Sequence, residues 1–257
     1  MTFLRVVRPL EALATVALVV AATPPWARQY LPGPHLGPVI IAPACLALAN
    51  NIAAEIRPSE DSPRVLGFGV AIGLAALLYL GCVFSIVGPY PHAAIYAFGM
   101  VALSLAHALF LKRVAILGGV AAALIVALML PWSRLAIGSH AGALVGPAIA
   151  TFAFVWALDA LRTALDPTTP AMISREGCIV LFTTLSVVGA ISALIIVFLF
   201  TRSWSGRVLG ALPALAFAYA GVRANLATDR VTLLHLVVVV KGALVLGIVA
   251  LALSPSE

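Results

Sequence analysis

Charge is what this sequence has least of. Only 9% of its 257 residues are Asp, Glu, Lys or Arg, whereas a soluble domain usually carries about 25%. Hydrophobic residues make up 63% of the chain, and the mean hydropathy is +1.15. A soluble core of this size cannot hide so much apolar surface, so lipid is the expected solvent of the chain.

Signals of several other protein classes are also missing. The three cysteines form no CxxC pair, and we expect them to be small apolar packing residues rather than metal or redox groups. The sequence contains no HExxH zinc motif and no glycine-rich nucleotide loop. Its basic residues are scattered through loops between apolar runs, which favours a membrane topology signal over nucleic-acid binding.

Apolar runs of spanning length follow one another along the whole chain. A transmembrane helix needs about 20 apolar residues, and breaks at Pro, Gly and charge clusters separate nine candidates. They cover residues 7–23, 37–54, 66–87, 92–111, 114–130, 141–161, 178–200, 207–222 and 231–252. Because the first run is followed by many others, it is predicted to be a transmembrane helix rather than a cleaved signal peptide. We therefore predict one all-α domain over residues 1–257, a polytopic bundle of about nine transmembrane helices.

The basic residues predict an orientation for this bundle. With nine helices, the side of the N-terminus would hold Arg5, Arg8, Arg57, Arg64, Lys112, Arg113, Arg162, Arg175, Arg223 and Arg230. The opposite side would hold only Arg28, Arg134, Arg202 and Arg207. Cytoplasmic loops are enriched in Lys and Arg, so the N-terminal side is expected to be cytoplasmic in a multi-pass protein of the cell membrane.

Most of the nine acidic residues fall on that same side, in two short segments. The first segment contributes Glu55, Glu60 and Asp61, and the second contributes Asp159, Asp166 and Glu176. Within the first, Asn51 and Glu55 are four residues apart and share a helix face. Within the second, Asp159 and Asp166 are seven apart, again on one face, with Arg162 close to it.

The position of Asp159 is the most informative of these. It directly follows the apolar run TFAFVWAL, so we expect it at membrane depth or just above. A carboxylate there is costly unless it is paired or bound to a metal. Two acidic patches facing each other across a bundle mouth would suit Mg²⁺, and nearby Lys112 and Arg113 could hold the oxygens of a phosphate-bearing substrate.

Simpler interpretations stay open for some of these residues. The stretch from Arg57 to Arg64 is compatible with an ordinary solvated loop, and Lys112-Arg113 alone with a positive-inside anchor. His107 lies near the end of a predicted helix and could line a cavity, although a packed, neutral histidine is the expected state. The coincidence of all these charges on one face favours a functional site.

Four segments in order then resemble the UbiA superfamily of intramembrane prenyltransferases. They are the opening Arg8-Pro9-Leu10-Glu11, the stretch NNIAAEIRPSEDSPR after the second helix, AHALFLKRVAILGG between the fourth and fifth, and DALRTALDPTTP after the sixth. The resemblance implies a UbiA-like fold with a lipid-facing cavity closed by two acidic motifs. It also implies transfer of a prenyl group from a prenyl diphosphate to a hydrophobic or aromatic acceptor, with Mg²⁺ as cofactor.

The resemblance further implies roles for single residues. Glu55, Asp159 and Asp166 would hold the metal, and Asn51, Lys112, Arg113 and Arg162 would bind the diphosphate. Asp159, Asp166 and Lys112 would be the catalytic groups. The apolar walls would keep water from the allylic cation.

The chain departs from the family pattern at four positions. Glu55 stands where an Asp is usual, Ser59 where a second Asp is usual, Ala108 where a Tyr is usual, and Pro170 at or near the place of the last acid of the second motif. These departures leave two alternatives open, a UbiA-type terpene cyclase and a non-catalytic isoprenoid-binding membrane subunit. A transporter is less favoured, because the acidic residues cluster on one face rather than at the membrane midplane.

Overall fold

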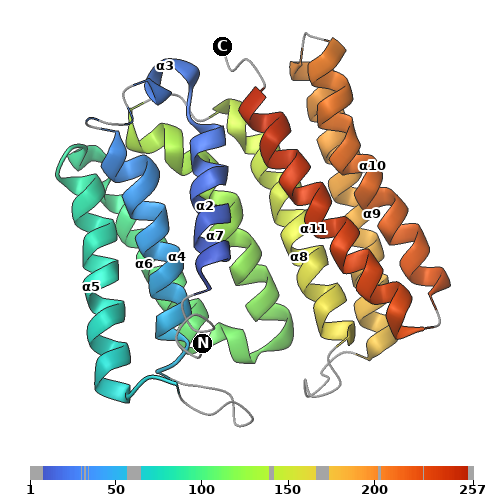
Figure 1. Cartoon of the computed structure of the whole chain (residues 1–257), viewed down its shortest axis with the longest axis horizontal. Helices are drawn as coiled ribbons and strands as arrows, with labels where there is room; N and C mark the ends of the chain where they lie inside the picture. Colours follow the sequence, from blue (N-terminus) through green and yellow to red (C-terminus); the bar gives the residue numbers. More distant parts are fainter. Residues whose placement is uncertain are drawn as a thin grey trace. The chain divides into compact units, whose positions relative to one another are not determined.

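The computed structural model describes residues 8–29, 31, 33, 35–56, 65–138, 142–165, 174–201, 204–227 and 229–253. These residues form helices and connecting turns, with no strand among them (Figure 1). The all-α prediction is therefore confirmed for this part of the chain. Contacts divide the chain into two compact units, Met1–Val114 with Leu128–Gly142 and Ser256–Glu257, and Ala115–Ala127 with Ala143–Pro255.

Helix α4 is the central helix of unit 1 and packs against three other helices of this unit. Its elements are α2 (Pro9–Ala22), α3 (Pro25–Arg28), η1 (Gly37–Ile41), α4 (Ala42–Ala53), α5 (Phe68–Val87), η2 (Pro91–Ala93), α6 (Ala94–Leu109) and η3 (Leu111–Arg113). Helix α4 contacts α2, α5 and α6. A methyl group at Gly37 would collide with the carbonyl oxygen of Ser85, so only glycine lets η1 approach α5 this closely.

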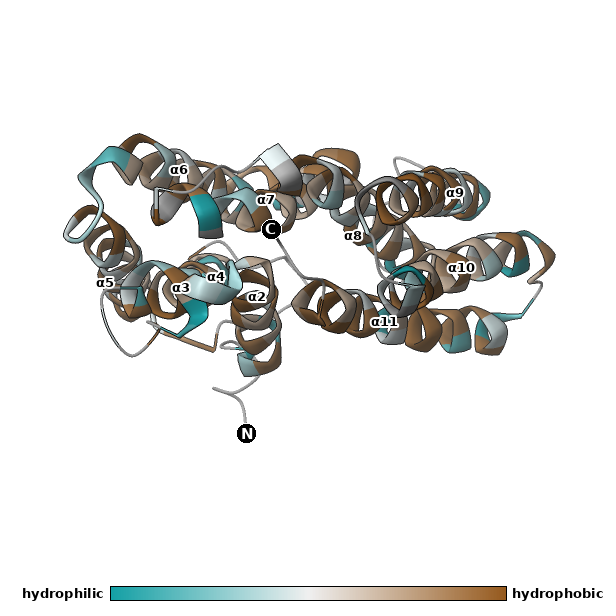
Figure 2. Cartoon of the chain, turned by 90° about the horizontal axis from the view of Figure 1, so that it is seen from above, coloured by the Kyte–Doolittle hydropathy of each residue, from teal (hydrophilic) through white to brown (hydrophobic). Residues whose placement is uncertain are grey.

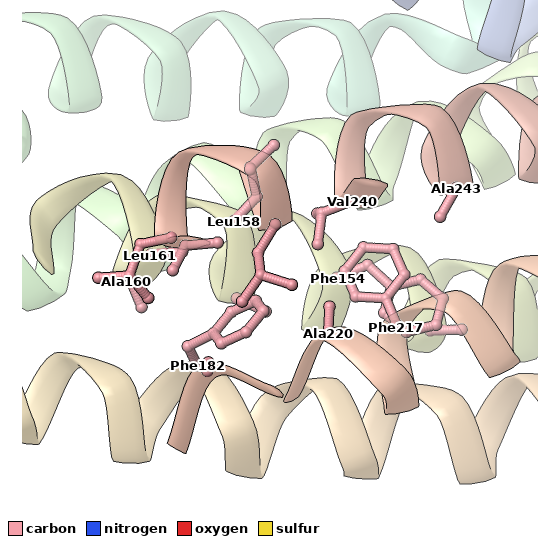
Figure 3. Packing of buried hydrophobic residues seen from close by; sticks show 14 residues of the cluster. Phe154, Leu158, Ala160, Leu161, Phe182, Phe217, Ala220, Val240 and Ala243 are labelled. Carbon is pink, nitrogen blue, oxygen red and sulfur yellow. The ribbon is translucent and has the colours of Figure 1, made fainter. Parts of the chain in front are cut away.

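Unit 2 consists of long helices that pack as neighbours in sequence order. They are α8 (Val145–Leu165), α9 (Arg175–Phe200), α10 (Trp204–Leu226) and α11 (Arg230–Leu253). Its core contains the stacked rings of Phe154 and Phe217, whose centroids are 3.8 Å apart, and the fully buried Phe182 (Figure 3). A methyl group at Gly189 would overlap the ring of Phe154, so this glycine allows α8 and α9 to pack closely, as is common in membrane bundles.

Helix α7 (Ala115–Ala136) belongs to both units. Its first part, to Ala127, lies in unit 2, and from Leu128 it lies in unit 1. The sequence predicted that this helix ends at residue 130, but it continues past Pro131 to Ala136. A proline inside a helix removes one hydrogen bond and often bends the helix, and here it does not end it.

The outward surfaces of the helices are apolar. Most of each helix has the colour of hydrophobic residues, while hydrophilic residues occur mainly near helix ends and connections (Figure 2). On α9, for example, Val180, Val188, Ile191 and Phe198 are each about half exposed or more. Exposed apolar area on this scale is not stable in water and is expected where lipid surrounds the helices.

Within the described part of the chain, six helices are long and apolar enough to cross a membrane. They span Phe68–Val87, Pro91–Leu109, Val145–Leu165, Arg175–Phe198, Gly206–Leu226 and Arg230–Leu253. Three further apolar helices, Pro9–Ala22, Gly37–Ala53 and Ile116–Trp132, are shorter. The chain is thus a multi-pass membrane protein, while nine spans and a single domain stay predictions.

Candidate functional site

In unit 1, Glu55 and Lys112 lie at the same end of the helices. Glu55 lies in a turn just after α4, where its Oε2 accepts a hydrogen bond from the backbone N–H of Val65 at 3.1 Å. Lys112 lies in η3, just after α6, and its side chain is exposed. The carboxylates of Glu55 and Glu11 both act on its charge. Of the first acidic segment, the structure therefore brings Glu55 to the same end of this unit as Lys112.

Burial and the neighbouring charges both act on the pKa of Lys112. Partial loss of hydration lowers the pKa of the Lys112 ammonium, and the charge of Arg8 lowers it further, whereas Glu55 and Glu11 raise it. Arg8 itself pairs with Glu11, its Nη1 lying 3.3 Å from Oε1, and both side chains are about half exposed. This is the only ion pair within 4 Å among the residues that the structure describes. Lys112 therefore keeps donors available for an anionic ligand.

Asn51, the predicted diphosphate residue, lies in the last turn of α4 beside Asn50. Asn50 rather than Asn51 is the centre of a polar network between helices. Its Oδ1 accepts from Ser104 Oγ at 3.3 Å and lies 3.1 Å from His107 Nδ1. Ser104 Oγ in turn lies 3.0 Å from the hydroxyl oxygen of Tyr79. The network therefore links α4, α5 and α6 on the membrane side of Glu55 and Lys112.

This network fixes the side chain of His107. Because an amide oxygen only accepts, His107 Nδ1 carries the hydrogen in this arrangement. His107 is 9% exposed, and the charge of Lys112 acts on it. The burial of His107 agrees with the expectation of a packed histidine, and the hydrogen bond to Asn50 fixes the orientation of its ring. Sequence reasoning missed Asn50, Ser104 and Tyr79, although polar residues inside apolar runs are a signal for such networks.

In unit 2, Asp159 lies within the span Val145–Leu165, less than two turns from its end. Its carboxylate is partly exposed and makes no side-chain hydrogen bond or ion pair within 4 Å to any residue of the described ranges. Arg162, one turn later, is exposed, and its charge acts on Asp159 without forming such a pair. Among the described residues, the Asp159 carboxylate therefore has no partner inside a helix that is apolar enough to span a membrane, and a metal or cationic group would relieve the cost of such a state.

Gly119 shapes the space beside this carboxylate. It is buried on α7, and a methyl group there would overlap Oδ2 of Asp159 and lie 3.1 Å from Cδ1 of Trp156. Only a glycine lets the Asp159 side chain lie directly against the backbone of α7. Nothing in the sequence indicates that the partner of this glycine is the acidic residue itself.

Other predicted site residues are not placed. Asp166, Glu60 and Asp61 lie outside the described residues, and for Arg113 the structure places only the backbone, at the end of η3. Within the described ranges, no three side chains of His, Cys, Asp or Glu gather into a metal-binding cluster. Each unit nevertheless contributes a carboxylate of the kind that Mg²⁺ uses, Glu55 in unit 1 and Asp159 in unit 2, because that ion is usually bound by one or two carboxylates together with water and substrate phosphate.

Comparison with known proteins then tests the fold. No protein-family model matches the sequence, and no curated protein matches it. One solved structure, of a digeranylgeranylglyceryl phosphate synthase in membranes, is similar with a TM-score of 0.74. The match is 13% identical in sequence and covers 99% of this chain and 97% of the synthase. The chain therefore shares its fold with this membrane synthase, as the resemblance to the UbiA superfamily leads one to expect.

Proposed function

We propose that the chain is a Mg²⁺-dependent intramembrane prenyltransferase, which moves a prenyl group from a prenyl diphosphate to an aromatic or lipid acceptor. One observation carries the proposal: the Asp159 carboxylate lies within a membrane-spanning helix with no described protein partner. A fold shared with a digeranylgeranylglyceryl phosphate synthase supports the same reaction class. The site would open at the cytoplasmic face of the cell membrane.

The proposed roles follow from the chemistry of each side chain. Glu55, Asp159 and Asp166 would bind the metal through carboxylate oxygens. Bound Mg²⁺ would supply positive charge to the diphosphate. Lys112, Arg113 and Arg162 would donate hydrogen bonds to its oxygens, and Asn51 would position it.

The reaction breaks the bond between the prenyl C1 carbon and the diphosphate oxygen. Negative charge builds up on the departing pyrophosphate, so fixed cations such as Lys112 lower the barrier. The acceptor then forms a bond to C1 and loses a proton, which makes pyrophosphate and the prenylated acceptor the products. The apolar walls of the helices would exclude water, which would otherwise capture the allylic cation.

Purified protein incubated with a labelled prenyl diphosphate and Mg²⁺ tests this proposal. We expect pyrophosphate release in the wild type and a loss of at least a hundredfold in Asp159→Asn, because the amide cannot bind the metal as a carboxylate does. Glu176→Gln is the matched control, since Glu176 is an exposed acid in the first turn of α9 in the same unit.

Unchanged pyrophosphate release in Asp159→Asn would refute the metal role. Product analysis by gas chromatography separates transfer from cyclisation, because a terpene cyclase forms a hydrocarbon without any acceptor. Prenyl lipid binding without turnover would favour the non-catalytic alternative.

A further inference from the structure

A second cluster of charge lies at the other end of unit 1, away from Glu55 and Lys112. Helix α2 ends there at Ala22, α3 ends at Arg28, and α7 ends at Ala136. Two arginines, Arg28 and Arg134, therefore lie at the same end of the unit. The described acids of this unit, Glu11 and Glu55, lie at the opposite end.

Arg134 is the unusual member of this pair. Its side chain is only 6% exposed, and its Nε is buried with no hydrogen-bond partner among the residues that the structure describes. A buried donor without an acceptor costs about 1–3 kcal/mol, and more when it belongs to a charged group. The fold therefore leaves a cationic donor for which the described residues provide no acceptor.

Arg28 adds a second positive charge and is itself held in place. Its Nε donates to the carbonyl oxygen of Thr23 at 2.8 Å, and its Nη2 donates to that of Ala21 at 2.7 Å. These bonds anchor the guanidinium at the C-terminal end of α2, where a positive charge is favourable. Arg28 is close enough for its charge to act on Arg134, and together with burial it lowers the pKa of the Arg134 guanidinium. Two cations that repel each other near one unsatisfied donor form an environment suited to an anion.

The surroundings indicate the depth of this cluster in the membrane. The ring of His35 lies 6.2 Å from that of Trp26 and 5.9 Å from that of Tyr90, and Trp26 is half exposed. Tryptophan and tyrosine are enriched where the bilayer meets water, which is also the level of lipid phosphate groups.

A cavity of about 540 Å³ lies at the same end of the unit. It is lined mainly by apolar residues of α6 and the last part of α7: His92, Ala93, Ile95, Tyr96, Gly99, Met100, Leu128 and Leu135.

We propose that Arg134 and Arg28 form a phosphate-binding site at the membrane interface, at the end of unit 1 opposite to Glu55 and Lys112. Its ligand is a phosphate group, supplied either by an anionic phospholipid or by free phosphate. The guanidinium of Arg134 would donate to the phosphate oxygens, and the charge of Arg28 would add to the attraction. The apolar cavity nearby could accept part of an acyl chain, which favours the lipid as the source.

Thermal unfolding of the full-length protein in a neutral detergent tests this site. The added probes are phosphatidylglycerol, diacylglycerol and inorganic phosphate, each compared with detergent alone. For the wild type we expect phosphatidylglycerol, and not diacylglycerol, to raise the midpoint by several degrees. Stabilisation by inorganic phosphate alone, to the same extent, would support the site and identify free phosphate as its ligand.

The variant Arg134→Met separates this binding from a structural role. Methionine fills the same apolar space without a donor, so without ligand the variant should be as stable as the wild type or more so. It should also lose the phosphatidylglycerol shift, with an apparent affinity at least tenfold weaker. Arg134→Lys is the second variant: it keeps the charge but loses the planar donors, and it should weaken binding less.

Arg207→Met is the matched control. Arg207 lies in unit 2, where its Nε donates to the carbonyl oxygen of Thr201 at 2.7 Å, so it resembles Arg28 but has its partner within the chain. This variant should keep the full phosphatidylglycerol shift. The proposal is wrong if neither phosphatidylglycerol nor inorganic phosphate stabilises the wild type, or if Arg134→Met keeps the shift in unfolding midpoint. It is also wrong if Arg134→Met and Arg207→Met lose this shift equally.

Discussion

The contact between Gly119 and Asp159 allows the sharpest test of the proposed metal site. In Gly119→Ala, the new methyl group would overlap Oδ2 of Asp159 and press on Trp156. Overpacking of this kind costs about 1–3 kcal/mol, while replacing glycine by alanine inside a helix gains up to about 1 kcal/mol. We therefore expect a net destabilisation of up to about 2 kcal/mol, together with a displaced carboxylate and a loss of Mg²⁺-dependent pyrophosphate release.

A double-mutant cycle isolates the contribution of the carboxylate. In the Asp159→Ala background the overlapping oxygen is absent, so Gly119→Ala should cost about 1–2 kcal/mol less than in the wild type. Gly73→Ala is the control, because Gly73 lies in helix α5 with open space at its Cβ position. Unfolding of the four proteins of the cycle in detergent measures the coupling, and pyrophosphate release measures the functional effect in Gly119→Ala.

Two results would refute this reasoning. An equal cost of Gly119→Ala in both backgrounds would mean that the methyl group does not meet Asp159. Full pyrophosphate release in Gly119→Ala would mean that the position of this carboxylate does not matter for catalysis.

Three further predictions concern stability, each measured by unfolding in detergent. Ser186→Ala should leave the protein equally stable or stabilise it by about 1 kcal/mol, because Ser186 Oγ is buried without a hydrogen-bond partner in the described structure; a clear loss of stability would contradict this. Tyr79→Phe should cost about 0.6 kcal/mol, and at most about 1.7, because it removes the hydrogen bond to Ser104 within the membrane; a larger loss would show that packing also changes. Asp229 accepts hydrogen bonds from Thr232 N and Oγ1 at the start of α11, and these bonds lower its pKa below the ordinary 3.8. Its stabilising effect relative to Asp229→Ala should therefore be complete above pH 3.8 and disappear as the pH falls through the lower folded-state value; a difference that persists in stronger acid would rule out this cap.

The lengths of the apolar runs predicted the helices well, because a membrane-spanning segment has to be apolar over most of its length. The errors lie at helix ends. The eighth predicted helix, 207–222, is longer in the structure, Trp204–Leu226, since polar residues such as Arg223 and Asn225 can continue a helix once it leaves the lipid. The helix predicted over residues 114–130 continues past Pro131 to Ala136.

Within the candidate site, the sequence indicated which helices carry charged residues, but not the direction in which each side chain points. The apolar run before Asp159 predicts its position at membrane depth, and the structure places the residue inside the apolar helix Val145–Leu165. Two adjacent asparagines look equivalent in sequence, yet only Asn50 is seen to receive hydrogen bonds from Ser104 and His107. Neighbouring residues on a helix point about 100° apart, so which of two neighbours faces a partner depends on packing between helices that the sequence does not reveal.

The division of helix α7 between the two units has a mechanical consequence. A helix of 22 residues is about 33 Å long, and α7 contributes one part of this length to each unit. Any reorientation of one unit against the other has to strain this helix or the short connections beside it. Pro131 lies just past the point where α7 passes from one unit to the other, and the backbone hydrogen bond that it lacks makes this the weakest stretch of the helix. Bending of α7 should therefore concentrate near Pro131, between the part of the helix that carries Gly119 and the part that carries Arg134.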